Sequence, residues 1–249
     1  MQTQGDSGAA PTGGTHWERL APGVVRRRLP GWDATVGAIA GTDGVLVVDT
    51  GSSLHEGVEI RREAQELFGL PVTHIALTHP HFDHVLGTAA FSGVQVYAAV
   101  GAAELMARER EELRHDAVRH GMDPDTAAEA VDLLVLPHHP VSGELTVDLG
   151  GGRRVLLANI GPGHTAHDLA VLVAGEREIV FCGDVVEESG EPQAGPDALP
   201  HAWPAALDRL LTLGGDDAVY VPGHGAVVDA AFVRAQRDAL AERFGMSGS

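Results

Sequence analysis

His79-Pro80-His81-Phe82-Asp83-His84 places three histidines and one aspartate within six residues, directly after the apolar run at residues 75–77. Alternate residues of an extended segment point to the same side, so His79 and His81 can bind one metal ion together. Asp83 and His84 lie on the following turn, where they would face a second ion. Imidazole nitrogens suit zinc, copper, iron or nickel, and a carboxylate among them suits a site that also holds a nucleophile. The spacing therefore predicts a two-metal site at the end of a buried strand.

The sequence before this segment predicts a hairpin, a helix and further strands. Ser53 and Glu56 form a capping-box pattern that begins the helix, and Gly69 ends it. Apolar residues such as Val58 and Leu67 follow the cap at helical spacing. Short β-branched runs bounded by turn residues predict the strands. These strands cover residues 34–40, 45–48, 73–77 and 94–97.

After the histidine segment, the stretch 102–135 is predicted to be helical, with interruptions at Gly121 and Pro124. We identify this stretch as the main candidate for a substrate-selecting element. Four short strands joined by glycine-containing turns then favour an antiparallel or mixed sheet. A loop rich in proline, glycine and acidic residues is expected over 184–200. The four strands are predicted at 144–149, 153–159, 169–174 and 178–182. A further strand is predicted at 218–221, between helices at 203–213 and 228–244.

The composition excludes several kinds of partner. The formal net charge is −18, and all 17 basic side chains are arginines. Such a surface repels phosphate backbones, which bind clusters of Lys and Arg, so we expect no nucleic-acid partner. No stretch approaches the roughly 18 apolar residues of a membrane span, so we expect no membrane partner either. We expect a small-molecule substrate instead.

Length and cysteine content predict the domain organisation and the compartment. Residues 1–15 are rich in Gly, Ser, Thr and Ala and lack the basic and apolar regions of a signal peptide, which predicts a disordered tail. The remaining residues, 16–249, have a length that commonly forms one domain. The single cysteine, Cys182, allows no intrachain disulfide and requires no oxidising compartment. We therefore expect a cytoplasmic protein with one domain.

Five motifs in the chain resemble those of the metallo-β-lactamase superfamily, and they occur in the family's order. Residues 79–84 are similar to its HxHxDH signature, and the resemblance extends over about 32–244. It implies an α/β fold, the four-layer αββα sandwich, in which two mixed sheets lie face to face with helices outside. The other four motifs are residues 47–51 (Val-Val-Asp-Thr-Gly), 161–165 (Gly-Pro-Gly-His-Thr), 181–184 (Phe-Cys-Gly-Asp) and 221–225 (Val-Pro-Gly-His-Gly).

The resemblance also implies two sets of metal ligands. It assigns His79, His81 and His164 to the first metal ion. It assigns Asp83, His84 and His224 to the second, with Asp184 bridging the two ions. Asp49 would hold ligand orientation through hydrogen bonds instead of binding metal.

The local sequence is consistent with these assignments. His164 follows a Gly-Pro-Gly turn, Asp184 ends a predicted strand, and glycines flank His224 and let the backbone approach a metal closely. Two further histidines are candidates for other roles: His167, three residues after His164, could hydrogen-bond to a metal ligand, and His201 could reach the mouth of the pocket. Cys182 is expected to be a buried thiol at a strand end.

With two zinc ions, this ligand set indicates a hydrolase. A metal-bridging hydroxide, oriented by Asp83, would attack an activated acyl group such as a thioester, lactone or β-lactam. The related families are glyoxalase II-like, lactonase-like and β-lactamase-like enzymes. Because the chain has no lysine, the lysine that binds the substrate carboxylate in certain β-lactamases has no equivalent here. The alternative is a mononuclear persulfide dioxygenase of the same fold, with one Fe²⁺ on the three histidines of the first site.

Overall fold

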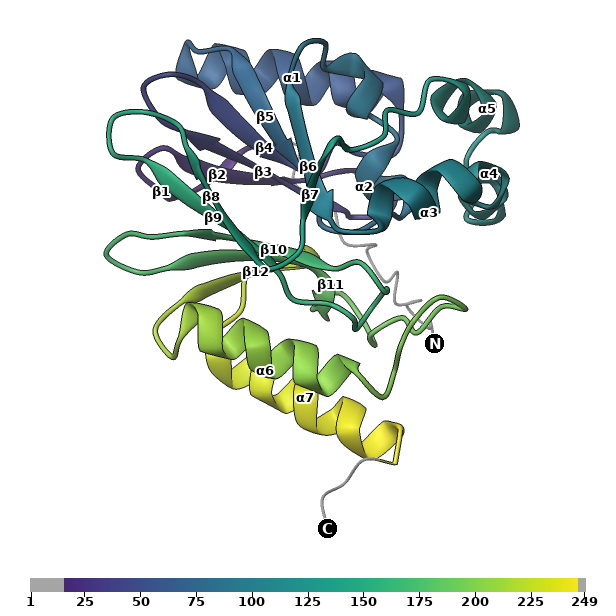
Figure 1. Cartoon of the computed structure of the whole chain (residues 1–249), viewed down its shortest axis with the longest axis vertical. Helices are drawn as coiled ribbons and strands as arrows, with labels where there is room; N and C mark the ends of the chain where they lie inside the picture. Colours follow the sequence, from purple (N-terminus) through teal and green to yellow (C-terminus); the bar gives the residue numbers. More distant parts are fainter. Residues whose placement is uncertain (1–15, 246–249) are drawn as a thin grey trace, which may run out of the picture.

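The computed structural model describes residues 16–245, which form two β-sheets packed face to face with helices on their outer sides (Figure 1). One sheet has the strand order β1-β2-β3-β4-β5-β6-β7, and the other has the order β12-β11-β10-β9-β8. Both sheets are mixed, since each contains parallel and antiparallel pairs. The predicted αββα sandwich is therefore confirmed. The predicted tail, residues 1–15, lies outside the described residues.

The first sheet begins with antiparallel hairpins and continues with parallel strands. The predicted hairpin of β3 and β4 is present, with Ala40 opposite Val45. From β4 to β7 the strands run parallel, so their carboxyl ends meet at one edge of the sandwich. The strands are β1 (Glu18–Ala21), β2 (Val24–Arg28), β3 (Thr35–Ala40), β4 (Val45–Val48), β5 (Val72–Ala76), β6 (Gln95–Ala99) and β7 (His139–Val141).

Helix α1 (Leu54–Phe68) connects β4 to β5 and is capped as the sequence predicts at both ends. The Ser53 side chain accepts a hydrogen bond from the Glu56 amide, and Gly69 takes the left-handed conformation that ends the helix. The Glu56 carboxylate in turn accepts from the Ser52 amide. The apolar residues Val58 and Leu67 are exposed. The buried face of the helix is formed by Gly57, Ile60 and Ala64.

The second sheet is antiparallel from β8 to β11, and β12 then pairs in parallel with β11. The prediction that a loop begins at Asp184 was wrong, because β11 continues to Glu187. Val185 and Val186 are buried in the core beneath the outer helices, which keeps the chain in the sheet. The elements are β8 (Glu144–Asp148), β9 (Arg154–Asn159), β10 (Leu169–Val173), β11 (Ile179–Glu187) and β12 (Val219–His224), covered by α6 (Trp203–Gly214) and α7 (Ala230–Arg243).

The predicted helical stretch 102–135 forms three short helices that stand beside the first sheet (Figure 1). The interruptions fall where the sequence predicts them: Gly121 has φ 98°, and Pro124 occupies the first turn of the last helix. Among residues 16–245, no helix combines the length and the apolar composition of a membrane span. The helices are α3 (Ala102–Arg108), α4 (Arg110–Arg119) and α5 (Pro124–Asp132); the shorter α2 (Phe82–Val85) and the 3₁₀ turn η1 (Thr88–Ala90) precede them.

The two sheets approach each other closely where Gly37 of β3 faces Phe181 of β11. A side-chain carbon built on Gly37 would lie 2.5 Å from a ring carbon of Phe181. The ring is buried in the core between the sheets and cannot turn out into solvent. This position therefore requires a residue without a side chain.

We expect Gly37→Ala to lower the free energy of unfolding by about 1–3 kcal/mol, the usual effect of overpacking a core. Urea unfolding of the parent and the variant measures the difference. Adding Phe181→Leu should recover part of the loss, because the two positions share one space. Gly143→Ala is the control, since no atom lies within 4 Å of a carbon added there. Equal stability of the Gly37→Ala protein and the parent would contradict this account of the interface.

Candidate metal centre

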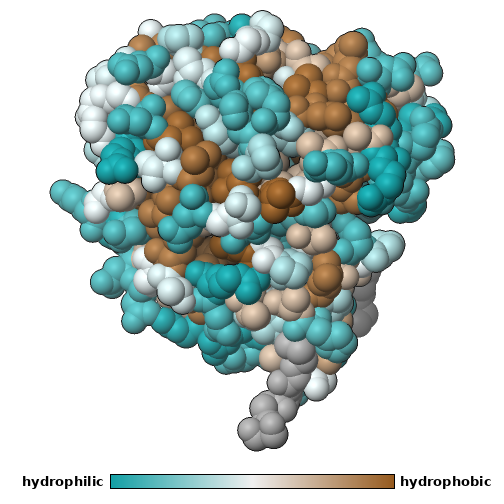
Figure 2. All heavy atoms as spheres, in the orientation of Figure 1, coloured by the Kyte–Doolittle hydropathy of each residue, from teal (hydrophilic) through white to brown (hydrophobic). Residues whose placement is uncertain are grey.

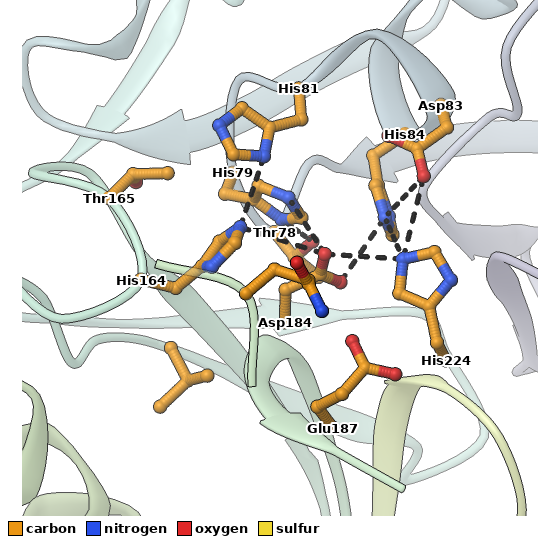
Figure 3. A network of polar contacts seen from close by, with 12 residues as sticks. Thr78, His79, His81, Asp83, His84, His164, Thr165, Asp184, Glu187 and His224 are labelled. Atoms are coloured by element: carbon orange, nitrogen blue, oxygen red, sulfur yellow. Dashed lines mark hydrogen bonds and ion pairs between the residues drawn. The ribbon is translucent and has the colours of Figure 1, made fainter. Parts of the chain in front are cut away.

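The residues assigned as metal ligands lie together where several strands end (Figure 3). The parallel strand β5 leads into the segment that carries four of them. The loop between β9 and β10 carries His164, β11 carries Asp184, and His224 is the last residue of β12. The structure thus brings together all seven residues: His79, His81, Asp83, His84, His164, Asp184 and His224.

One group surrounds the site implied for the first metal ion. His79, His81, His164 and Asp184 each offer a ligand atom, and these atoms all lie within 4.8 Å of one another. Nε2 of His164 is 3.0 Å from Nδ1 of His81. Nε2 of His79 and Nε2 of His164 are each 3.6 Å from Oδ2 of Asp184. Three imidazoles and one carboxylate converging in this way suit a tetrahedral zinc site.

The second group is formed by Asp83, His84 and His224, whose ligand atoms also lie within 4.8 Å of one another. Nε2 of His224 is 3.4 Å from Oδ2 of Asp83 and 3.5 Å from Nε2 of His84. Asp184 contacts this group too. Its carboxylate lies 3.3 Å from His84 and 3.2 Å from His224. One carboxylate therefore touches both groups.

Buried polar atoms without a hydrogen-bond partner indicate that the centre needs a cation. Within the described chain, Nε2 of His79 and Oδ1 of Asp184 are buried and unpartnered. Leaving such an atom unsatisfied costs about 1–3 kcal/mol, and more when it is charged. A bound divalent ion would satisfy both atoms at once. The donor set therefore fits metal.

The pKa shifts show how the charge is distributed. Burial lowers the pKa of His164 to about 4, so this imidazole is neutral, as a metal ligand must be. Burial also disfavours the charged form of His224, but the carboxylates of Asp184 and Asp83 outweigh it and raise its pKa to about 10. A raised histidine pKa means that the site stabilises positive charge there. Either a proton or a metal ion can supply that charge.

Asp49 fixes the position of residues 78–84 through hydrogen bonds. It is buried, its backbone adopts a left-handed conformation, and its carboxylate accepts hydrogen bonds from the Thr78 amide and the Thr78 hydroxyl, both at 2.7 Å. Nδ1–H of His84 donates to the same carboxylate at 2.9 Å. The other nitrogen of His84 is thereby left with its lone pair toward the site. Asp49 thus fixes both the path of the chain and the tautomer of one imidazole.

Sequence reasoning missed two carboxylates at the site. Nε2–H of His81 donates to Asp197 at 2.9 Å, which turns Nδ1 of His81 toward the centre. Glu187 lies beside Asp184 and His224, with all three ligand atoms within 4.8 Å (Figure 3). Asp197 is 116 positions from its partner, in a loop rich in acidic residues, so no local spacing marks it. Glu187 was assigned to that same loop.

The other candidates lie away from the centre. His167 is partly buried, and its Nδ1–H donates to the backbone carbonyl of Val100. His201 is exposed. Cys182 is a buried strand thiol as predicted, and burial raises its pKa far above the usual thiol range. None of the three belongs to a metal-binding group found among the described residues.

A cavity of about 1000 Å³ opens above the ligand cluster. His81, Asp83, His164, Asp184 and His224 line its base. Helices α3 and α4 form one wall, and the loop at 189–197 forms another. The stretch 102–135 therefore contributes to the pocket, and a substrate bound here would contact both walls.

Comparison with known proteins shows where this architecture occurs. A family model described as the metallo-beta-lactamase superfamily matches residues 29–224. Among solved structures, the metallo-beta-lactamase from Pontibacter korlensis has a TM-score of 0.72 at 21% identity, with 90% of this chain and 98% of that chain covered.

Two further structures are similar. The metallo-beta-lactamase from Hirschia baltica has a TM-score of 0.67 at 18% identity, covering 90% of this chain and 97% of that one. FIM-1 from Pseudomonas aeruginosa, solved in a mono-zinc form, has a TM-score of 0.69 at 20% identity, covering 93% and 96%. At these identities the structures show a shared fold.

Asp49→Asn should destabilise the protein by about 1.5–3 kcal/mol, because hydrogen bonds to a charged acceptor are lost. An amide keeps one acceptor oxygen, and its NH₂ group would then face a donor. Urea unfolding of metal-free protein measures the effect without any contribution from bound ions. Asp217→Asn, an exposed position, is the matched control. If both variants are as stable as the parent, the role assigned to Asp49 is wrong.

Proposed function

Because the chain belongs to the metallo-beta-lactamase superfamily, we propose that it is a hydrolase that holds two zinc ions and cleaves an activated acyl compound. The substrate would be a small molecule such as a thioester, a lactone or a β-lactam. The observation that carries this proposal is the position of Asp184. Its carboxylate contacts histidines of both groups, at 3.6 Å in the first and at 3.2 and 3.3 Å in the second.

The residues of each group fit a divalent ion in different ways. His79, His81 and His164 would hold the first ion, and nitrogen ligands of this kind favour zinc. Asp83, His84 and His224 would hold the second, with Asp184 shared. When bound, such a pair of ions lowers the pKa of water toward neutrality and polarises a substrate carbonyl. No separate oxyanion hole or strong base would then be required from the chain.

Asp83 is the residue that we assign to catalysis. Its Oδ2 lies 3.4 Å from His224 and 3.6 Å from His84, and the residue lines the floor of the cavity. From this position the carboxylate can orient a water molecule by accepting a hydrogen bond from it, and it can then take up a proton from that water. The same group can pass that proton to the leaving sulfur, oxygen or nitrogen. Asp49 supports this work indirectly by holding His84 in place.

Metal content and its dependence on Asp184 test the proposed centre. We expect about two metal ions per chain, mainly zinc, in protein purified without added metal. Asp184→Ala should reduce the occupancy of both ions together, since one carboxylate serves both groups. Elemental analysis measures both results. Loss of only one ion would disprove the bridge, and one iron per chain with almost no zinc would favour a mononuclear dioxygenase instead.

Asp83→Asn tests the assigned catalytic role. The variant keeps the shape of the side chain but removes the charge that orients water, so we expect turnover to fall by about 10²- to 10⁴-fold. The fold should survive, and thermal unfolding checks this. Asp132→Asn, on the exposed end of α5, is the control and should keep full activity. A stable Asp83→Asn protein with near-parent activity on its best substrate would contradict the mechanism.

A further inference from the structure

The cavity above the ligand cluster carries many more acidic than basic groups. Besides Asp83 and Asp184, six carboxylates line it, and Arg119 is the one basic side chain other than histidine among the lining residues. These six are not needed as ligands of the two groups of the proposed hydrolase centre. They are Glu109, Glu112, Asp116, Glu187, Glu191 and Asp197.

Arg119 is already paired within the wall. Its guanidinium donates to Asp116 at 2.8 Å and to Glu112 at 2.9 Å. Arg108 and Arg243 pair with two other wall carboxylates at the rim, but neither arginine lines the cavity. Since the chain has no lysine, no other lysine or arginine of this cavity remains to bind a substrate carboxylate.

The acidic groups on helix α4 follow a helical repeat. Glu112 and Asp116 are four residues apart, so their side chains share one face of the helix. Glu109 lies at the junction between α3 and α4, directly before this helix. Leu113 lies on the same face and is buried. In Figure 2 hydrophilic residues cover much of the edge where α3, α4 and α5 lie.

An apolar surface accompanies the acidic one. Leu105, Met106 and Leu113 line the cavity from α3 and α4. Trp32 and Phe82 line it as well, and their rings meet edge to face with centroids 5.3 Å apart. A ligand in this cavity would therefore meet carboxylates and hydrocarbon side by side.

We propose that this cavity selects acyl substrates with an apolar body and a positively charged group, and rejects substrates with a free carboxylate. The proposal rests on the proposed hydrolase function. The charge of two bound divalent ions would be largely offset by Asp83, Asp184 and the activated water. The six outer carboxylates outnumber the three arginines paired with them, Arg108, Arg119 and Arg243, so the wall presents a net negative charge to an approaching substrate. A cleft lined by one sign of charge concentrates ligands of the opposite sign.

The reaction itself is balanced by water alone. Water adds to the acyl carbon, the bond from that carbon to sulfur, oxygen or nitrogen breaks, and the leaving group takes the proton. The product is a carboxylic acid, which releases the second proton of the water to solvent and becomes a carboxylate. The acidic wall repels this product and would thereby speed its release.

This selection has a consequence for β-lactams. Penicillins and cephalosporins carry a free carboxylate beside the lactam ring, and the cavity offers it repulsion where a basic partner would be needed. Thioesters of the anionic peptide glutathione meet the same obstacle. We therefore expect both to be poor substrates, even though solved structures of this fold include proteins named metallo-beta-lactamases.

Three matched thioesters test the proposal. They share one apolar acyl chain that ends in a trimethylammonium, a methyl or a carboxylate group, and zinc-loaded protein hydrolyses them with release of a detectable thiol. We expect kcat/KM to decrease in that order, with at least about a tenfold difference between the cationic and anionic compounds at low salt. Raising the ionic strength should shrink the difference by screening. An equal or reversed order would overturn the charge selection while leaving the hydrolase intact.

Variants locate the effect on the cavity wall. Glu109→Gln combined with Glu191→Gln should reduce the preference for the cation by about threefold or more, because two wall charges are removed. The control combines Glu111→Gln with Glu176→Gln, two exposed carboxylates that do not line the cavity. This control removes the same net charge and should leave the preference unchanged. Equal effects in both double variants would overturn the assignment to the wall.

Binding separates this proposal from the hydrolase proposal. The corresponding thioethers, in which a CH₂ group replaces the carbonyl, cannot be hydrolysed, and calorimetry on zinc-loaded protein gives their Kd values. Tighter binding of the cation than of the anion, with no thioester cleaved, would disprove thioester hydrolysis and support the charge selection. Equal binding of the three thioethers would overturn the selection whatever the activity.

Discussion

The buried carboxylate of Asp184 is the group on which the arrangement of this site depends. A buried charge is costly unless it is paired, so each neighbouring segment must bring a partner to it. The backbone has to come unusually close for this to happen. A side-chain carbon at Gly223 would overlap Oδ1 of Asp184, and one at Gly183 would lie 2.8 Å from Thr78. The glycines beside Asp184 and His224 thus allow β11, β12 and the histidine segment to meet. The histidines that Asp184 contacts are His79, His84, His164 and His224.

Most of the imidazoles around this carboxylate are oriented by a hydrogen bond from the ring nitrogen that faces away from the centre. His81 donates to Asp197, His84 donates to Asp49, and His224 donates from Nδ1 to the backbone carbonyl of Trp32 at 2.8 Å. In each case the donor nitrogen points away from the centre, so the other nitrogen is directed into it, where it can bind a metal ion. His164 differs, because its Nδ1 is buried without a partner among the described residues. Its ring rests edge to face on Trp203 instead, so packing holds it in place.

The sequence predicted the parts of this structure that depend on local spacing. The alternation at 79–84, the cap at Ser53 and the strand runs are short-range patterns, and each forms its element near the predicted residues. The sequence could not predict which residues distant along the chain would contact one another in the folded protein. Asp197 meets His81 only after the loop beyond β11 folds back over the site. The extension of β11 through Asp184 likewise depends on α6 and α7 covering Val185 and Val186.

The metal centre and the pocket wall differ in what constrains them. The ligands lie on β11, at the end of β12 and on segments that directly join strands, where a change of position would disturb the sheets and the core. The wall carboxylates Glu109, Glu112 and Asp116 lie on a helical segment beside the first sheet, and neither the core nor the ligand cluster includes them. Folding would tolerate neutral or basic residues at these positions, since they are partly or fully exposed. Their shared face on the cavity is therefore better explained by what enters the pocket than by what holds the protein together.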